Sequence, residues 1–112
     1  MIIAPFDVVV VPFPYSDRLA EKRRPALVVS APPLNDVLDR LWVAMITSAG
    51  GSLIYGDLEV WNLTAAGLPA ASILRASKLA TIDRDRVLRI AGRLDAQDRA
   101  AAMEVLRRCA AF

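Results

Sequence analysis

The sequence predicts a small, mainly β domain that ends in a helix. Short apolar segments rich in β-branched residues recur along the chain, and turn-forming residues separate them. No helix-length crossover lies between these segments, which favours a small barrel of five to seven short strands over a parallel sheet. At 112 residues the chain can fill one core but not two, so residues 1–112 are expected to form a single domain.

Two valine-rich segments begin the barrel. Residues 7–13 are expected to form the first strand, because four consecutive valines suit a strand that is buried on both faces. Pro12 indicates an edge or a bulge near the end of that strand. The second strand is expected at residues 25–31. Pro25 suits its first position, because proline cannot donate a ladder hydrogen bond, and it holds Arg24 in an extended conformation at the mouth of the strand.

The middle of the chain predicts two further strands. A polar stretch with two prolines, residues 32–40, is expected to form no regular element. Residues 41–48 form an apolar segment that ends in two hydroxyls, Thr47 and Ser48. After a glycine turn, alternation of apolar and acidic residues predicts a half-exposed strand over residues 53–61.

A loop and a fifth strand come next. One helical turn is expected at residues 62–66, closed by Gly67. Residues 72–80 alternate between apolar and polar side chains and therefore predict a strand. This alternation places Arg75 and Ser77 on one face of it.

The chain is expected to end in a short strand and a helix. Asp83 suits the cap of a short helical turn, and residues 86–94 predict a last strand in which Gly92 marks a bulge or a close-packing point. Asp95 is the expected cap of a helix over residues 96–109. Its apolar positions at helical spacing predict a core-facing stripe that places Met103 and Cys109 in or near the core, and the stripe comprises Ala96, Ala100, Met103, Leu106 and Ala110.

Composition limits the chemistry. There is no histidine, which excludes Ser–His and Cys–His nucleophile pairs and histidine-containing zinc sites. The carboxylates are scattered, so no metal and no cofactor are expected. The lone Cys109 cannot form an internal disulfide, and no apolar run approaches the roughly 20 residues that span a bilayer. We therefore expect a cytoplasmic protein without a membrane segment or a signal peptide.

The cations favour an anionic partner. The net charge is only +2, but residues 75–108 carry nine cations against five acids. Lys22, Arg23 and Arg24 form a second cluster immediately before Pro25. A guanidinium held at the mouth of a strand can meet a phosphate or a carboxylate with its planar fork. A solvated charge run in front of a core strand is the alternative interpretation of the same residues.

Six motifs, in this order, resemble the MazF/PemK family of toxin endoribonucleases. They are DVVVVPFPYSD at residues 7–17, KRRPALVVS at 22–30, AMITS at 44–48, AGLP at 66–69, RASKLATID at 75–83 and GRL at 92–94. The resemblance covers nearly the whole chain, from about Asp7 to Leu106. It implies an SH3-like barrel with a C-terminal helix, a homodimer, and inhibition by a cognate antitoxin with a partly disordered tail.

The resemblance also implies an activity. Members of the family cleave single-stranded RNA at short preferred sequences without a metal. The 2′-hydroxyl attacks the adjacent phosphate and leaves a 2′,3′-cyclic phosphate and a 5′-hydroxyl. Arg24 and Thr47 match the catalytic positions, since a rigidly held guanidinium and a hydroxyl can both stabilise the charge that develops on the phosphate. The general base is not identified by the residues, and Asp17 and Glu21 are its candidates.

Further residues are candidates for RNA contacts. The first loop combines an aromatic ring, a hydroxyl and cations, as single-stranded nucleic acid sites do. The candidates are Tyr15, Ser16, Asp17, Lys22, Arg23, Ser48, Arg75 and Ser77. The sequence departs from the family at two places, because Ser77 stands where some members have an acid and Phe6 stands where a glycine is common. The alternatives left open are a barrel that binds RNA or a partner without cleavage, and a DNA gyrase poison that acts through an aromatic C-terminus such as Phe112.

Overall fold

A single antiparallel sheet forms the body of the protein. The computed structural model describes residues 1–13 and 22–112. In this part of the chain six strands pair in the order β4-β5-β3-β2-β1-β6. The strands are β1 (Asp7–Phe13), β2 (Lys22–Val28), β3 (Arg40–Ser48), β4 (Asp57–Glu59), β5 (Ser72–Asp83) and β6 (Arg89–Arg93). The expectation of a mainly β fold with a C-terminal helix is confirmed.

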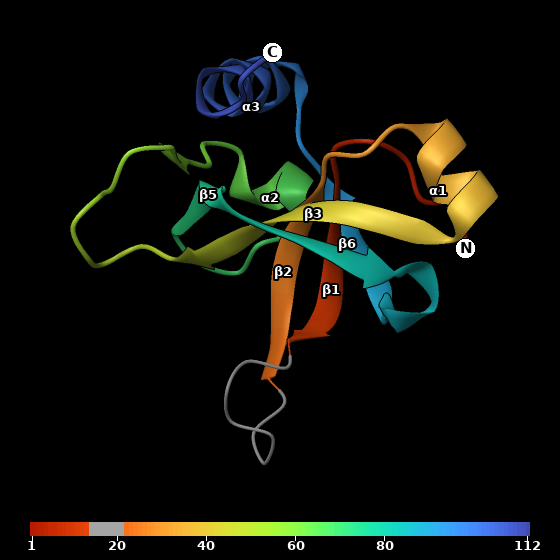
Figure 1. The fold of residues 1–112 in the computed structure, drawn as a ribbon. Helices are drawn as coiled ribbons and strands as arrows, with labels where there is room; N and C mark the ends of the chain where they lie inside the picture. Colours follow the sequence, from red (N-terminus) through yellow and green to blue (C-terminus); the bar gives the residue numbers. More distant parts are fainter. Residues whose placement is uncertain (14–21) are drawn as a thin grey trace.

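Within the described residues, three helices and one 3-10 turn accompany the sheet. They are α1 (Pro32–Leu38), α2 (Leu63–Ala66), η1 (Arg84–Arg86) and α3 (Ala96–Cys109). In Figure 1, α3 (dark blue) and α2 (green) lie on the same side of the bent sheet. In the same view, β1 and β2 lie at a steep angle to β3 and β5. No described helix is long and apolar enough to cross a membrane.

The bent sheet buries both of its faces. Val9 and Val11 of β1 belong to one core, which also holds Val28 and Val43. Val8 belongs to a second core, which includes the α2 and α3 residues Ala66 and Ala102. The expectation that the first strand is buried on both faces is therefore confirmed, since alternate valines enter different cores.

Prolines account for two differences from the expected boundaries. The second strand begins at Lys22, three residues earlier than expected, although its ladder with β3 starts at Ala26, directly after Pro25. The stretch expected to be irregular contains α1, whose prolines lie at its first positions. Proline is accepted there, because the first N–H groups of a helix have no intrahelical partner. Pro12 lies beyond the pairing of β1 with β6, which ends at Val10.

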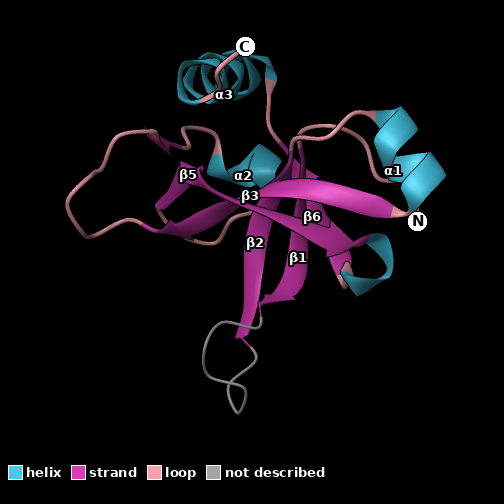
Figure 2. Cartoon of the chain, viewed as in Figure 1, coloured by secondary structure: helices cyan, strands magenta, loops and turns pink. Residues whose placement is uncertain are grey.

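The expected strand over residues 53–61 is wrong in extent. Only Asp57–Glu59 pairs with β5. The preceding loop bends back, because the Asp57 carboxylate accepts a hydrogen bond of 3.0 Å from the Ile54 N–H. Figure 2 shows the loop between β3 and β4 extending away from the sheet. Alternation alone did not distinguish a strand from this exposed loop.

Glycines permit a close contact between α2 and β6. Gly67 ends α2 in the left-handed conformation, as expected, and Gly92 lies in β6 beside a bulge in the β1–β6 ladder. A Cβ atom on Gly92 would lie 2.3 Å from the Ala65 carbonyl oxygen. The expected close-packing role of Gly92 is confirmed, because two backbones touch at this point.

We expect Gly92→Ala to lower the free energy of unfolding by about 3 kcal/mol, because backbone rather than a flexible side chain opposes the added methyl. Urea unfolding followed by circular dichroism measures the change. Gly51→Ala is the matched control, since nothing lies within 4 Å of a Cβ at that position. Equal stability of the two variants would contradict the close contact.

The C-terminal helix has the expected limits but a different buried face. The Asp95 side chain caps it by accepting a hydrogen bond of 2.8 Å from the Asp98 N–H. The buried residues are Asp98, Ala102 and Val105, whereas Met103 is 42% exposed and Cys109 is exposed. Placing Met103 and Cys109 in the core was therefore wrong.

The reason is a buried carboxylate on the inner face of α3. Asp98 is 2% exposed and accepts hydrogen bonds from the backbone N–H groups of Trp61, at 3.1 Å, and Asn62, at 2.8 Å. It thereby supplies partners to the N–H groups that precede α2. An expectation based on apolar positions alone places an aspartate on the solvent-facing side of a helix. The expected buried face therefore differed from the observed one, which contains Asp98.

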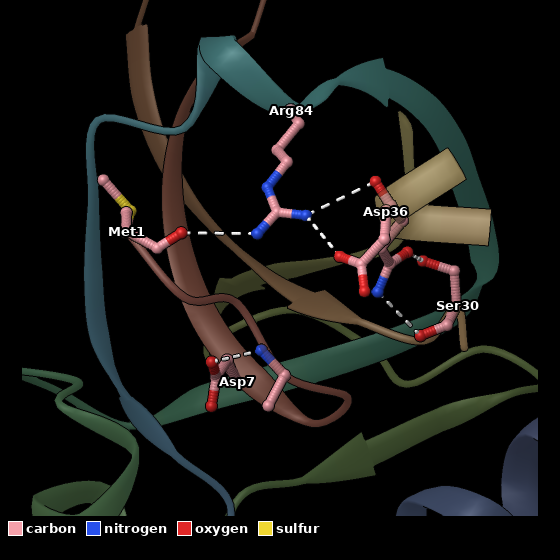
Figure 3. A network of polar contacts seen from close by, with 7 residues as sticks. Met1, Asp7, Ser30, Asp36 and Arg84 are labelled. Carbon is pink, nitrogen blue, oxygen red and sulfur yellow. Dashed lines mark hydrogen bonds and ion pairs between the residues drawn. The ribbon is translucent and has the colours of Figure 1, made fainter. Parts of the chain in front are cut away.

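Ion pairs and hydrogen bonds fix the end of the molecule near the N-terminus. Arg84 donates to the Met1 carbonyl at 3.3 Å and to the Asp36 carboxylate at 2.9 Å, and buried Asn35 pairs with Ser30 (Figure 3). These contacts join the N-terminal segment, α1 and η1. Arg84 is thereby paired with groups of the protein itself.

Phe6 adopts an unusual backbone conformation. Its φ is +67°, a value that side-chain-bearing residues rarely adopt and glycine adopts freely. The Arg99 guanidinium lies 4.9 Å from the centre of the Phe6 ring, which offsets part of the backbone strain.

Candidate functional site

Strand register brings the two expected catalytic residues together. The β2–β3 ladder pairs Ala26 with Met45, and its extension by two residues places Arg24 opposite Thr47. Both side chains line a small cavity of about 130 Å³. The remaining lining residues are Met45, Ile46, Arg75 and Lys78. Three cations and one hydroxyl therefore line a space large enough for a phosphate group.

Arg24, which lines this cavity, carries a donor without a partner. Its Nε atom is buried and has no hydrogen-bond partner. Leaving a buried N–H without an acceptor costs about 1–3 kcal/mol, so such donors are rare in folded proteins. An anion in the cavity would supply the missing acceptor. This orphaned donor is the strongest sign of a ligand site in the described part of the chain.

Arg75 reaches the same cavity from β5. Its Nε and Nη2 atoms both donate to the Asp57 carboxylate, each at 2.9 Å. The hydrogen bond from Arg75 is the main cause that holds the pKa of Asp57 below its ordinary value. The same bond raises the pKa of Arg75. Both groups are therefore ionised at neutral pH, and the ion pair fixes the direction of the guanidinium.

The Asp57 pair predicts a loss of stability in acid. Because the folded-state pKa of Asp57 lies below its unfolded value of about 3.9, the pair stabilises the protein above that value and ceases to do so as the pH falls through the folded-state pKa. We expect the difference in melting temperature between wild type and Asp57→Asn to be constant from pH 7 to 5 and to shrink below pH 4. Thermal unfolding from pH 7 to 2 measures it. A difference that persists at pH 2 would contradict this account.

A larger cleft adjoins the small cavity. Its volume is about 320 Å³, and it shares Arg24, Ile46 and Thr47 with the cavity. The other residues along it are Lys22, Arg23, Pro25, Ser48, Leu68, Pro69, Ala70 and Ser72. The cleft is thus lined by cations and hydroxyls together with apolar side chains. Such a lining suits a chain that carries phosphates on one side and bases on the other.

Four of the eight expected contact residues lie around these two spaces. Lys22, Arg23 and Ser48 line the cleft, and Arg75 lines the cavity. Tyr15, Ser16 and Asp17 belong to residues 14–21, outside the described part of the chain, as does Glu21.

Ser77 lies elsewhere. The β3–β5 register shifts between Ala44 and Met45, whose partners are Leu79 and Arg75, so residues 76–78 bulge out of the ladder. Ser77 lines a separate, mostly apolar cavity beside the end of α3. The expectation that Arg75 and Ser77 share a face was therefore wrong, because the bulge breaks the alternation.

Sequence reasoning did not identify Lys78 or Asp57 as part of the site. Lys78 reaches the cavity through the bulge, which no local pattern signals. Asp57 was assigned to the polar side of an expected strand. Its pairing with Arg75 follows from the β4–β5 register, in which the two residues are direct partners.

A cavity of about 630 Å³ near the N-terminus is a weaker candidate. Its cations are already paired, Arg40 with Asp83 at 3.1 Å and Arg84 with Asp36 at 2.9 Å. It shares no lining residue with the Arg24 cavity. Over residues 1–13 and 22–112, no group of three Cys, Asp or Glu side chains is placed to hold a metal ion.

Solved structures share this small barrel and its terminal helix. The Mycobacterium tuberculosis toxin MazF-mt6 is 22% identical, with a TM-score of 0.72 over 91% of this chain and 93% of that chain. A mycobacterial endoribonuclease in complex with its cognate antitoxin is 14% identical, with a TM-score of 0.77 over 96% and 93%. A MazE-MazF structure from Deinococcus radiodurans is 18% identical, with a TM-score of 0.73 over 97% and 95%. At these identities the likeness establishes the fold.

The family follows from the sequence model. Residues 4–109 match the family described as PemK-like, MazF-like toxins of type II toxin–antitoxin systems. The chain belongs to this family. No curated protein matches it.

Proposed function

We propose that the protein is an endoribonuclease toxin that cleaves single-stranded RNA without a metal ion. The observation that carries this proposal is the buried, unpartnered Nε of Arg24, a residue that lines with Thr47 a cavity large enough for a phosphate group. Membership of a toxin family, and the endoribonuclease named among the similar folds, support an RNA substrate.

The chemistry needs few groups. The 2′-hydroxyl of the substrate attacks the adjacent phosphorus, the bond to the 5′-oxygen breaks, and a 2′,3′-cyclic phosphate and a 5′-hydroxyl result. Negative charge builds up on the non-bridging oxygens during the attack. The Arg24 guanidinium donates to one of these oxygens and stays protonated throughout, and the Thr47 hydroxyl donates to the same phosphate.

Pro25 and the β2–β3 ladder prepare Arg24 for this role. The ladder ends at Ala26, and Pro25 restricts the backbone of the residue before it. Little conformational freedom is then lost when the phosphate binds, which makes the donor more effective in the transition state.

The binding surface extends along the adjoining cleft. Lys22, Arg23 and Ser48 contact the backbone of the RNA in this proposal, and Tyr15, Ser16 and Asp17, which precede them in the sequence, contact bases. Preference for a short sequence arises from bases held in loop pockets. The protein acts in the cytoplasm as a homodimer, and a cognate antitoxin covers the same groove.

The test is digestion of a long single-stranded RNA in the presence of EDTA, followed by mapping of the fragment ends. Cleavage at a short recurring sequence with cyclic phosphate ends, absent in Arg24→Ala, is the expected result. Intact RNA in the presence of folded wild-type protein would overturn the proposal. Tests of RNA binding without cleavage and of DNA gyrase inhibition would then distinguish the remaining alternatives.

A further inference from the structure

Asp57 places a fully buried carboxylate against Arg75, one of the cations that line the cavity. The side chain of Asp57 is 0% exposed, whereas that of its partner Arg75 is 30% exposed. The Asp57 carboxylate accepts both hydrogen bonds from Arg75 and a third, of 3.0 Å, from the Ile54 N–H. A carboxylate with three donors and no solvent contact is held in one orientation.

This carboxylate leaves part of the guanidinium available. Arginine has five N–H donors in a fixed plane, and Asp57 takes one on Nε and one on Nη2. Three donors remain on a group that lines the same cavity as Arg24 and Thr47. An arginine without such a partner samples many rotamers, and fixing them upon binding would cost conformational entropy.

The negative charge has a second effect. Arg24, Arg75 and Lys78 line a cavity of about 130 Å³, and like charges so close together repel one another. Asp57 offsets one of the three charges before any anion binds. The cavity can therefore hold two oriented guanidinium groups in the folded, empty protein.

We propose that Asp57 is a positioning residue for RNA cleavage, which holds Arg75 in place as a second donor to the phosphate that Arg24 binds. This inference rests on the proposed function. Arg75 is the group that touches the substrate, and Asp57 acts only through it. Asp57 can act on Arg75 because the two residues are direct partners in the β4–β5 ladder.

The test compares the kinetics of Asp57→Asn with those of wild type on a short RNA that contains the mapped cleavage sequence. Asparagine keeps the shape of the side chain but turns one acceptor into a donor, which cannot face the guanidinium. We expect kcat to fall roughly 10–100-fold with a much smaller change in KM, because a donor that acts on the developing charge is misplaced. The measurement is made well below the melting temperature of the variant.

Two readouts separate positioning from a merely structural role. In an Arg75→Ala background, Asp57→Asn should lower kcat no further, because its effect passes through Arg75. The logarithm of the RNA-binding constant falls linearly with the logarithm of the salt concentration. The slope of this line should become about 0.7 less steep in Arg75→Ala, which removes a phosphate contact, and should keep its wild-type value in Asp57→Asn, which does not. Asp57→Glu, which keeps both acceptors, should recover part of kcat, and it takes the place of Asp57→Asn if that variant does not fold.

Asp83→Asn is the matched control. It removes the same charge from a different ion pair, that of Asp83 in β5 with Arg40 in β3, but the Asp83 side chain is 56% exposed and lies outside the cavity. We expect its kcat to equal that of wild type. A wild-type kcat for Asp57→Asn, or a further loss of kcat in the Arg75→Ala background, would overturn the positioning role while leaving RNA cleavage intact. Absence of cleavage by wild type would instead overturn the proposed function, and the positioning role with it.

Discussion

Replacement of Arg24 by alanine is expected to lower the rate of RNA cleavage at least about 10²–10³-fold while leaving the protein folded. The rate falls because a prearranged donor to the developing charge is lost. The fold persists because the Arg24 Nε makes no hydrogen bond within the protein. Removal of a buried donor without a partner should leave the melting temperature unchanged or slightly raised. Single-turnover cleavage and thermal unfolding of the same samples measure both effects.

Two further variants identify what Arg24 contributes. Arg24→Lys keeps the charge but loses the planar fork, so we expect it to recover only a minor part of the rate. Arg23→Ala removes an exposed neighbour from the same run of cations, and we expect mainly weaker, salt-dependent binding. If Arg23→Ala and Arg24→Ala reduced cleavage equally, the run would be a solvated charge cluster and Arg24 would have no special role.

The parts of the fold that were predicted correctly have local causes. Four valines and the segment after Pro25 specify strands whatever surrounds them, and Asp95 begins α3 through a hydrogen bond three residues away. The wrong predictions of the fold arose where one residue type is compatible with two different local structures. Proline breaks a helix in its interior but is accepted in its first turn, and only the structure shows that the prolines of α1 occupy the first turn.

The residues of the candidate site also comprise some that the sequence predicts and some that it does not. Arg24 was predicted from its position before Pro25 and from the family resemblance, whereas Thr47 was predicted from the resemblance alone. Asp57 and Lys78 were missed, because their places depend on pairing between strands that are distant in sequence. The Ala76 N–H donates to the Gly56 carbonyl at 2.9 Å, which ties the β5 bulge to the segment before β4. A single sequence carries no local sign of such a contact.

Thr47→Val is expected to reduce cleavage about 10²-fold with little change in stability. Valine keeps the shape and the strand preference of threonine but removes the hydroxyl that lines the cavity opposite Arg24. Thr47→Ser keeps the hydroxyl and should retain most of the rate. The comparison uses single-turnover kinetics, so that substrate binding and product release do not mask the chemical step.

Ser48→Ala provides the control for Thr47. Ser48 is the next hydroxyl on β3, is exposed, and lines only the adjoining cleft. Its removal should weaken RNA binding modestly and leave the single-turnover rate at saturating RNA close to that of wild type. Equal rates for Thr47→Val and wild type would show that Thr47 merely ends the strand, and Arg24 would then act on the phosphate without a neighbouring hydroxyl. A loss in Thr47→Val that Thr47→Ser does not share would place the hydroxyl itself in the chemical step, because the two variants retain a short side chain at the same strand position and differ in that donor.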